Sequence, residues 1–400
     1  MSTTFDDRSL RFPIGAQLTL DEVGRDPIRL TRLLREEEPV SWLPRAETWL
    51  VSSRELVEQV VRDHHRFTAE SEENTDRAVL GPTMLTVDGP QHDVHRKPFD
   101  PPMRAGHVGA FTGTINARVN EILANFASSG TADIVQDFAE PLGLKVVSDV
   151  LGFDYPEPER IRMLLAELFE AMQLHVGPEV REKANAVRRA FVPEVLRTLE
   201  EARMRAPESV LGMVANSSAD VPEEVLANNT INLMFGGVET TATLVTTTLW
   251  TLLSHPRQLR EVRENQSLLP QAIDESIRLH PAFAISLRWA AEDVELGGVR
   301  IPAGDRIYPL LIAANRDPSM FERPDDFDLH RANARQSNSF GRGLHFCIGQ
   351  NVARLVGHLS LAALLSQLPG LRLDEGHSPG QPTGLEFHRL PALRVLWDRE

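Results

Sequence analysis

The sequence is short of cysteine and of positive charge. Cys347 is the only cysteine among 400 residues, so neither a disulfide within one chain nor an iron–sulfur cluster is possible. Lysine and arginine number 42 against 57 aspartates and glutamates, and the formal net charge of −15 argues against nucleic acid as a partner. The amino terminus lacks the basic and apolar regions of a signal peptide, which favours a cytoplasmic protein.

Long uncharged stretches are also rare, and the one exception runs from Val225 to Ser254 with Glu239 as its only charged residue. A membrane helix is the first interpretation of such a stretch. Asn228, Asn229 and Asn232 argue against it, because their amides are costly in lipid. A long helix through a protein core tolerates them, so we expect a buried helix and no membrane span.

The pattern of apolar residues predicts a mainly α protein with small β-sheets. With 42% hydrophobic residues and no flexible linker, residues 1–400 are expected to form a single, monomeric domain. Helical periodicity recurs in Arg54 to Asp63, Val108 to Ala127, Glu157 to His175, Pro178 to Arg203, Val225 to Ser254, Gln271 to Leu279 and Gln350 to Leu368. Short strand-like runs occur at Val40 to Trp42, Trp49 to Val51, Val294 to Leu296, Ile307 to Leu311 and Leu393 to Trp397.

The surroundings of Cys347 set it apart from an ordinary buried cysteine. Gly343 and Gly349 flank it, so the backbone can fold tightly around the sulfur with its amides pointing inward. The helix predicted from Gln350 starts directly downstream, and its dipole favours a thiolate. Such a thiolate is a nucleophile, a redox thiol or a metal ligand. Zinc needs companion ligands at short spacing, which are lacking here, whereas haem iron needs only one axial ligand.

The run from Phe340 to Gly349 reads F-x-x-G-x-H-x-C-x-G and continues with Ala353 and Arg354. It resembles the haem-binding motif of the cytochrome P450 superfamily, soluble bacterial type. The resemblance implies the P450 fold, with haem b between a long oxygen-side helix and the helix after the cysteine loop. Cys347 would be the axial metal ligand, Phe340 an aromatic lid over the sulfur, and Gly349 part of the cofactor-binding loop.

A second matching segment is the E-x-x-R motif of Glu275 and Arg278, one helical turn apart. By itself this motif is weak evidence for the family, since surface ion pairs at this spacing are common. Arg331 matches the arginine that completes the family's buried Glu-Arg-Arg network. We therefore expect these three residues to determine the fold rather than the chemistry.

A third segment, Gly236 to Thr241, lies inside the uncharged stretch. Adjacent glycines in a helix cost about 1 kcal/mol each relative to alanine, so a kink or a function must account for them. The family's [AG]-G-x-[DE]-T motif implies that the helix loosens at Gly236 beside the haem. Thr240 would hydrogen-bond the reduced dioxygen, and Glu239 would relay protons from solvent.

The remaining matches concern the haem propionates. His92 and Arg96 lie four residues apart and would grip a propionate from one helical face. Arg288, in a segment like the family's strands after the E-x-x-R helix, and His345 would supply two further donors. His92 and His95 also have a spacing suited to zinc, but no third ligand is placed in a recognisable pattern.

The resemblance implies a monooxygenase of secondary metabolism that inserts one atom of O₂ into an apolar, medium-sized organic substrate. No flavin or nicotinamide motif is present, so electrons come from a separate ferredoxin or flavodoxin. A basic patch would suit such a donor, as would ordinary surface basicity; its candidates are Arg96, Lys97, Arg104 and Arg342. Alternative functions are non-oxygenating haem-thiolate chemistry such as coupling, dehydration or peroxygenation, a haem sensor, or a helical scaffold without cofactor.

By the same resemblance, five segments would line the substrate pocket. They are 68–85, 168–176, the part of the long helix before Gly236, 282–287 and 383–387. Their apolar members are Phe169, Met172, Leu174, Leu233, Met234, Phe283, Ile285, Leu287 and Phe387, and their polar candidates are His175, Ser286 and Glu386. Each of them singly is equally compatible with a place in the protein core.

Overall fold

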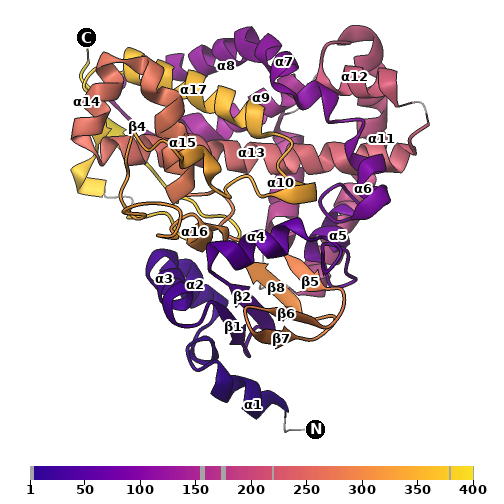
Figure 1. The fold of residues 1–400 in the computed structure, drawn as a ribbon. Coiled ribbons are helices and arrows are strands. Elements are labelled where there is room, and N and C mark those ends of the chain that lie inside the picture. Colours follow the sequence, from indigo (N-terminus) through magenta and orange to yellow (C-terminus); the bar gives the residue numbers. More distant parts are fainter. Residues whose placement is uncertain (1–3, 154–157, 173–176, 219, 378–379, 400) are drawn as a thin grey trace. The chain divides into compact units, whose positions relative to one another are not determined.

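A computed structural model gives the fold (Figure 1). It describes residues 4–153, 158–172, 177–218, 220–377 and 380–399. The predicted pocket residues Leu174 and His175 lie outside this part of the chain. The chain divides into two compact units, which are treated separately below. Unit 1 comprises residues 1–70, 271–347 and 380–391, and unit 2 comprises residues 71–270, 348–379 and 392–400.

Unit 1 is built on a five-stranded sheet in the order β1-β2-β8-β5-β3. Its strands are β1 (Val40–Leu43), β2 (Thr48–Val51), β3 (Phe67–Thr68), β5 (Arg288–Ala290) and β8 (Arg306–Pro309). A separate hairpin pairs β6 (Val294–Leu296) with β7 (Val299–Ile301). Its helices are α1 (Thr4–Arg11), α2 (Leu20–Arg25), α3 (Pro27–Glu37), α4 (Arg54–Arg62), α15 (Leu269–Leu279) and α16 (Leu311–Ala314).

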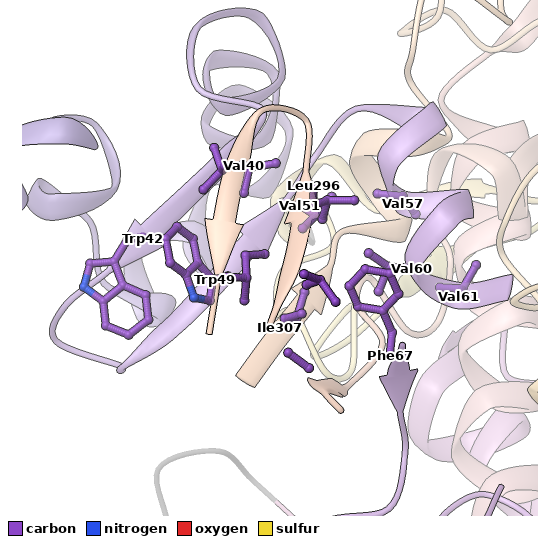
Figure 2. Packing of buried hydrophobic residues seen from close by; sticks show 14 of the residues in the cluster. Val40, Trp42, Trp49, Val51, Val57, Val60, Val61, Phe67, Leu296 and Ile307 are labelled. Atoms are coloured by element: carbon purple, nitrogen blue, oxygen red, sulfur yellow. The ribbon is translucent and has the colours of Figure 1, made fainter. Parts of the chain in front are cut away.

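The apolar core of unit 1 joins this sheet to α4 (Figure 2). Strand β2 pairs in parallel with β8 and places Trp49 opposite Ile307, and both side chains are buried. Val57, Val60 and Val61 project from α4 at helical spacing into the same cluster, as Figure 2 shows. Burial of this one face explains why the segment from Arg54 forms an amphipathic helix.

Unit 2 is helical apart from a three-stranded sheet in the order β4-β10-β9. The strands are β4 (Thr131–Asp133), β9 (Arg372–Leu373) and β10 (Arg394–Leu396). A π-helical turn spans Ile134–Ala139. The helices are α5 (Thr75–Leu80), α6 (Gly89–Arg96), α7 (Ala105–Val108), α8 (Thr112–Ala124), α9 (Glu140–Leu151), α10 (Pro158–Ala171), α11 (Pro178–Arg205), α12 (Val210–Ser217), α13 (Glu223–Leu253), α14 (Pro256–Glu264) and α17 (Gln350–Gln367).

Helix α13 is the central element of unit 2. It packs against α9, α11 and α17, and most of its second half is buried all round. A helix surrounded by others needs no polar face, which explains the uncharged stretch of the sequence. Within the described residues, no helix is long and apolar enough to cross a membrane.

The expectation of a mainly α fold with small sheets is confirmed. Several boundaries differ from the expected ones, and the structure explains two of the differences. The strand expected at Ile307 to Leu311 ends at Pro309, because the Leu310 carbonyl accepts the N–H groups of Ala313 and Ala314 and so starts α16. The helix expected from Val108 begins at Thr112, after a 3₁₀ turn that leaves α7 as a separate short helix.

Candidate functional site

The sequence-predicted site residues fall into two groups, one in each unit. Arg288, Phe340, His345 and Cys347 belong to unit 1. Unit 2 carries the other six, which are His92, Arg96, Gly236, Glu239, Thr240 and Gly349. Each group is described within its own unit.

The loop that carries Cys347 is closed by its own backbone and lies directly on α4. The N–H of Cys347 donates to the Phe340 carbonyl at 2.8 Å. Gly343 has φ +70°, and a Cβ there would lie 2.9 Å from the Val61 carbonyl oxygen. Only glycine fits this position, because a side chain would meet both backbone strain and the backbone of α4. The loop is thereby fixed, and the thiol of Cys347 is half-buried.

Gly349 stands at the start of α17. Its φ of −82° is open to any residue, so no left-handed conformation requires glycine there. It caps the start of α17, where no side chain supplies a capping hydrogen bond and no acidic residue stands in the first turn. The partial positive charge of this helix start is therefore not offset locally. Cys347 precedes the cap by two residues, a place in the chain where a thiolate is favoured.

The Glu-Arg-Arg network expected from the sequence is present in unit 1. The Glu275 carboxylate accepts from Arg278 Nε at 2.7 Å and Nη2 at 2.8 Å, and from Arg331 Nε at 2.8 Å. Side-chain exposure is 0% for Glu275 and Arg278 and 5% for Arg331. Arg278 also donates to the carbonyls of Asn315 and Pro324. The network joins α15 to the chain before the cysteine loop, as a fold determinant does.

Arg288 is buried at the first position of β5. Its Nη1 donates to the Leu287 carbonyl at 2.7 Å and to Ser286 Oγ at 3.2 Å. These two bonds orient the guanidinium. Ser286 was predicted to anchor a polar group of the substrate, and in the structure its hydroxyl contacts Arg288.

Two of the predicted pocket segments, 282–287 and 383–387, lie side by side in unit 1. Ala284 N–H donates to the Leu385 carbonyl at 2.9 Å. The rings of Phe283 and Phe387 are 4.9 Å apart. Segments separated by about a hundred residues are thus brought together by backbone hydrogen bonds and an aromatic pair, which periodicity alone does not reveal.

Glu239 and Thr240, the acid and the alcohol of the third motif, lie in the half-buried middle of α13. A Cβ added to Gly236 would meet nothing within 4 Å, whereas one added to Gly237 would lie 2.9 Å from Val147 of α9. Gly237 therefore serves packing, and Gly236 borders open space. The positions from Gly236 to Thr240 are half-buried, while those that follow are buried.

Thr240 Oγ1 donates to the Gly236 carbonyl at 2.6 Å, so the hydroxyl lies along the helix on the turn that borders this space. The resemblance implied that the helix loosens here, but α13 is continuous from Glu223 to Leu253. One glycine was missed by the sequence interpretation. A Cβ on Gly143 of α9 would lie 2.7 Å from the Val238 carbonyl, so this glycine lets α9 approach the motif closely.

His92 and Arg96 lie one turn apart on α6, as predicted. His92 is buried, and Arg96 Nε lies 3.5 Å from Asp100 Oδ1. Arg104 also pairs with Asp100, at 3.1 Å. Of the basic-patch candidates, Arg342 is occupied by its own loop, since it donates to the carbonyls of Gln336 and Ser337.

These residues fit a haem. The thiol of Cys347 lies in a fixed loop before a helix start that no side chain caps, which suits an iron ligand. Gly236 on α13 borders open space beside Glu239 and Thr240. The buried imidazole of His92 and guanidinium of Arg288 suit the carboxylates of the propionates. These are the residues that the sequence motifs identified.

Comparison with known proteins supports the same conclusion. The family model described as Cytochrome P450 matches residues 144–370. Nocardicin C N-oxygenase from Nocardia uniformis subsp. tsuyamanensis is 34% identical over 391 residues, 93% of this chain and 94% of that protein. The 6-deoxyerythronolide B hydroxylase of Saccharopolyspora erythraea is 32% identical over 301 residues, 74% of this chain and 73% of that protein.

Among solved structures, that of P450BioI in complex with hexadec-9Z-enoic acid ligated acyl carrier protein matches with a TM-score of 0.85 at 26% identity. The match covers 94% of this chain and 100% of that chain. The chain belongs to the cytochrome P450 family. It is a haem-thiolate monooxygenase, an oxidoreductase that uses O₂, an organic substrate and a redox partner.

Proposed function

We propose that this monooxygenase oxygenates an apolar, medium-sized molecule of secondary metabolism at a haem b held by Cys347. The observation that carries the proposal is the open space at Gly236, on the same half-buried turn as Glu239 and Thr240. The apolar side chains expected around the substrate and the relatives named as hydroxylase and N-oxygenase support the substrate class.

A thiolate-ligated haem, when bound, activates dioxygen and transfers one of its atoms to a C–H or C=C bond of the substrate. Cys347 would bind the iron through Sγ, and Phe340 would cover the sulfur. The imidazole and guanidinium groups of His92, Arg96, Arg288 and His345 would hold the propionate carboxylates.

The proton supply falls to Glu239 and Thr240. Thr240 Oγ1 holds its proton on the Gly236 carbonyl at 2.6 Å, and rotation about χ1 turns this O–H toward the space at Gly236. Glu239, adjacent in sequence and half-buried, returns a proton from solvent to the hydroxyl. An acid next to an alcohol therefore lets protons reach the reaction without admitting bulk water.

Electrons are proposed to come from a ferredoxin or flavodoxin that meets a basic surface near α6. Lys97 and Arg104 are exposed there, although Arg104 shares Asp100 with Arg96. An acidic donor would bind with a rate that falls as salt screens these charges. The monomeric state, the single domain of residues 1–400 and the cytoplasmic location stay predictions from the sequence.

Two measurements test the proposal. The reduced carbon monoxide difference spectrum should show the band of thiolate ligation, and Cys347→His should abolish it. A wild-type spectrum without that band would remove Cys347 as the ligand. Product formed under labelled dioxygen should carry the label, and unlabelled product would favour non-oxygenating chemistry.

Thr240→Ala should raise the peroxide released per NAD(P)H consumed, because the variant lacks the hydroxyl proton at this position. Thr247→Ala is the matched control. Its Oγ1 donates to the Thr243 carbonyl at 2.7 Å in the same geometry, but the residue is fully buried. Equal coupling in the two variants would mean that Thr240 serves the helix and not the proton supply.

A further inference from the structure

Two adjacent asparagines of α13, Asn228 and Asn229, are almost completely buried, and both side chains form hydrogen bonds. Asn228 Oδ1 accepts from the buried Arg188 of α11. Asn229 Oδ1 accepts from the Met84 N–H at 2.7 Å, and its Nδ2 lies 2.7 Å from the Val225 carbonyl and 2.9 Å from His95 Nδ1. Asn229 therefore ties α13 to α6 and to the segment before it.

The partners of Asn229 determine where its amide protons point. The Met84 N–H can only donate, so the atom facing it is the oxygen. The Val225 carbonyl can only accept, so the other atom is the nitrogen. The second proton of that nitrogen then points at His95, and His95 Nδ1 must be an acceptor without a proton. His95 is consequently neutral, with its proton on Nε2.

A charged His95 would break this arrangement. A proton on Nδ1 would place two N–H groups against each other at 2.9 Å, inside a site where His95 is 2% exposed. Burial lowers the pKa of His95, and the charge of Arg77 on α5 lowers it further. Asp93 and Arg96 are the charged neighbours on α6 itself, and α13 presents the uncharged Asn229.

His95 lies on the same short helix as His92 and Arg96, the residues proposed to hold a propionate. Any shift of α6 against α13 therefore moves the propionate donors relative to the helix that carries Glu239 and Thr240. We propose that Asn229 is a positioning residue: through neutral His95 it fixes α6 so that His92 and Arg96 can hold the haem propionate. We further propose that protonation of His95 in acid breaks this contact and speeds the loss of haem. The inference rests on the proposed roles of His92 and Arg96.

Two readouts that do not depend on catalysis test this role. Histidine-selective NMR of the diamagnetic ferrous carbonmonoxy protein should find His95 with a bare Nδ1 and a protonated Nε2 near neutral pH. The opposite tautomer, or a charged ring, overturns the proposal. Haem transfer to excess apomyoglobin then measures the rate of haem loss at about pH 8 and about pH 5. These values lie on either side of the ordinary histidine pKa of about 6.5.

The variants separate the hydrogen bond from its titration. Asn229→Leu and His95→Leu should speed haem loss about tenfold at the higher pH, a loss typical of outer partners of a cofactor site. At the lower pH they should differ little from the wild type, because acid has already broken the hydrogen bond there. His95→Gln keeps an acceptor for Asn229 but cannot titrate, so it should match the wild type at the higher pH and lose the acceleration at the lower one. A wild-type pH dependence in His95→Gln overturns the proposal.

Thr230→Val controls for disturbance of α13. Thr230 neighbours Asn229, is buried, and its hydroxyl has no hydrogen-bond partner in the described part of the chain. Its haem-loss rate should equal that of the wild type. Arg96→Leu tests the proposed propionate contact by itself: an unchanged rate there counts against the proposed function. An unchanged rate in Asn229→Leu overturns the positioning role whatever Arg96→Leu does.

Discussion

Replacing Glu275 by glutamine should destabilise the protein far more than the loss of one oxygen suggests. The carboxylate accepts two hydrogen bonds from Arg278, one from Arg331 and one from the Asp328 N–H, at 2.7 to 3.0 Å. All four partners are donors. In Glu275→Gln one acceptor becomes an NH₂ group that meets an N–H, and two buried guanidinium groups lose their counter-charge.

The expected loss is about 3–5 kcal/mol of unfolding free energy, the usual cost of breaking a buried ion pair by removing one partner. The figure applies because Glu275 and Arg278 have 0% side-chain exposure, so water cannot replace the missing acceptor. The assay is urea unfolding of the holoprotein, followed by circular dichroism and by the haem absorption band.

Glu200→Gln is the matched control, since Glu200 and Arg203 form an ion pair at the same i,i+3 spacing with 72% and 42% side-chain exposure. Its loss should stay below about 0.5 kcal/mol, because water screens and replaces an exposed pair. If Glu275→Gln costs no more than Glu200→Gln, the buried network does not hold the fold, and the reasoning from burial is wrong.

Gly343→Ala should destabilise the cysteine loop and weaken the thiolate band of the carbon monoxide spectrum, because its Cβ would lie 2.9 Å from the Val61 carbonyl oxygen. Gly298→Ala has a similar φ of +76° with nothing within 4 Å, so equal effects would leave backbone strain as the only cause. His388 is fully buried in unit 1, and burial lowers its pKa to about 3. A depressed histidine pKa gives stability that is present above the unfolded pKa of about 6.5 and is lost as pH falls toward the folded value. His388→Gln should therefore flatten the acid side of the stability curve between these two pKa values in urea titrations, and an unchanged curve would contradict this assignment.

The long helix α13 was predicted well from periodicity and composition. Its bounds, Glu223–Leu253, agree closely with the expected stretch from Val225, since an uncharged run of that length has few alternatives to a buried helix in a protein core. The short helices α2 and α14 were among those not predicted. Each carries few apolar positions, so tertiary contacts rather than local pattern decide whether it forms.

The candidate site divides in the same way. The motif around Cys347 identified the thiol, and the spacing of Glu275 and Arg278 identified their pairing, because both depend on residues close in sequence. Gly143 and Asn229 carried no such signal. Their roles arise from partners on other helices: Gly143 admits the Val238 carbonyl of α13, and Asn229 holds Met84 and His95.

The sequence by itself determined the class of protein, because one cysteine with its glycines, an acid next to a threonine and an E-x-x-R pair are local patterns tied to the chemistry or the fold of one family. Only the tertiary structure decided which glycine borders open space, which carboxylate is buried and where the amide protons of Asn229 point. These properties depend on burial and on hydrogen-bond partners far away in the chain, and neither is encoded in the spacing of neighbouring residues.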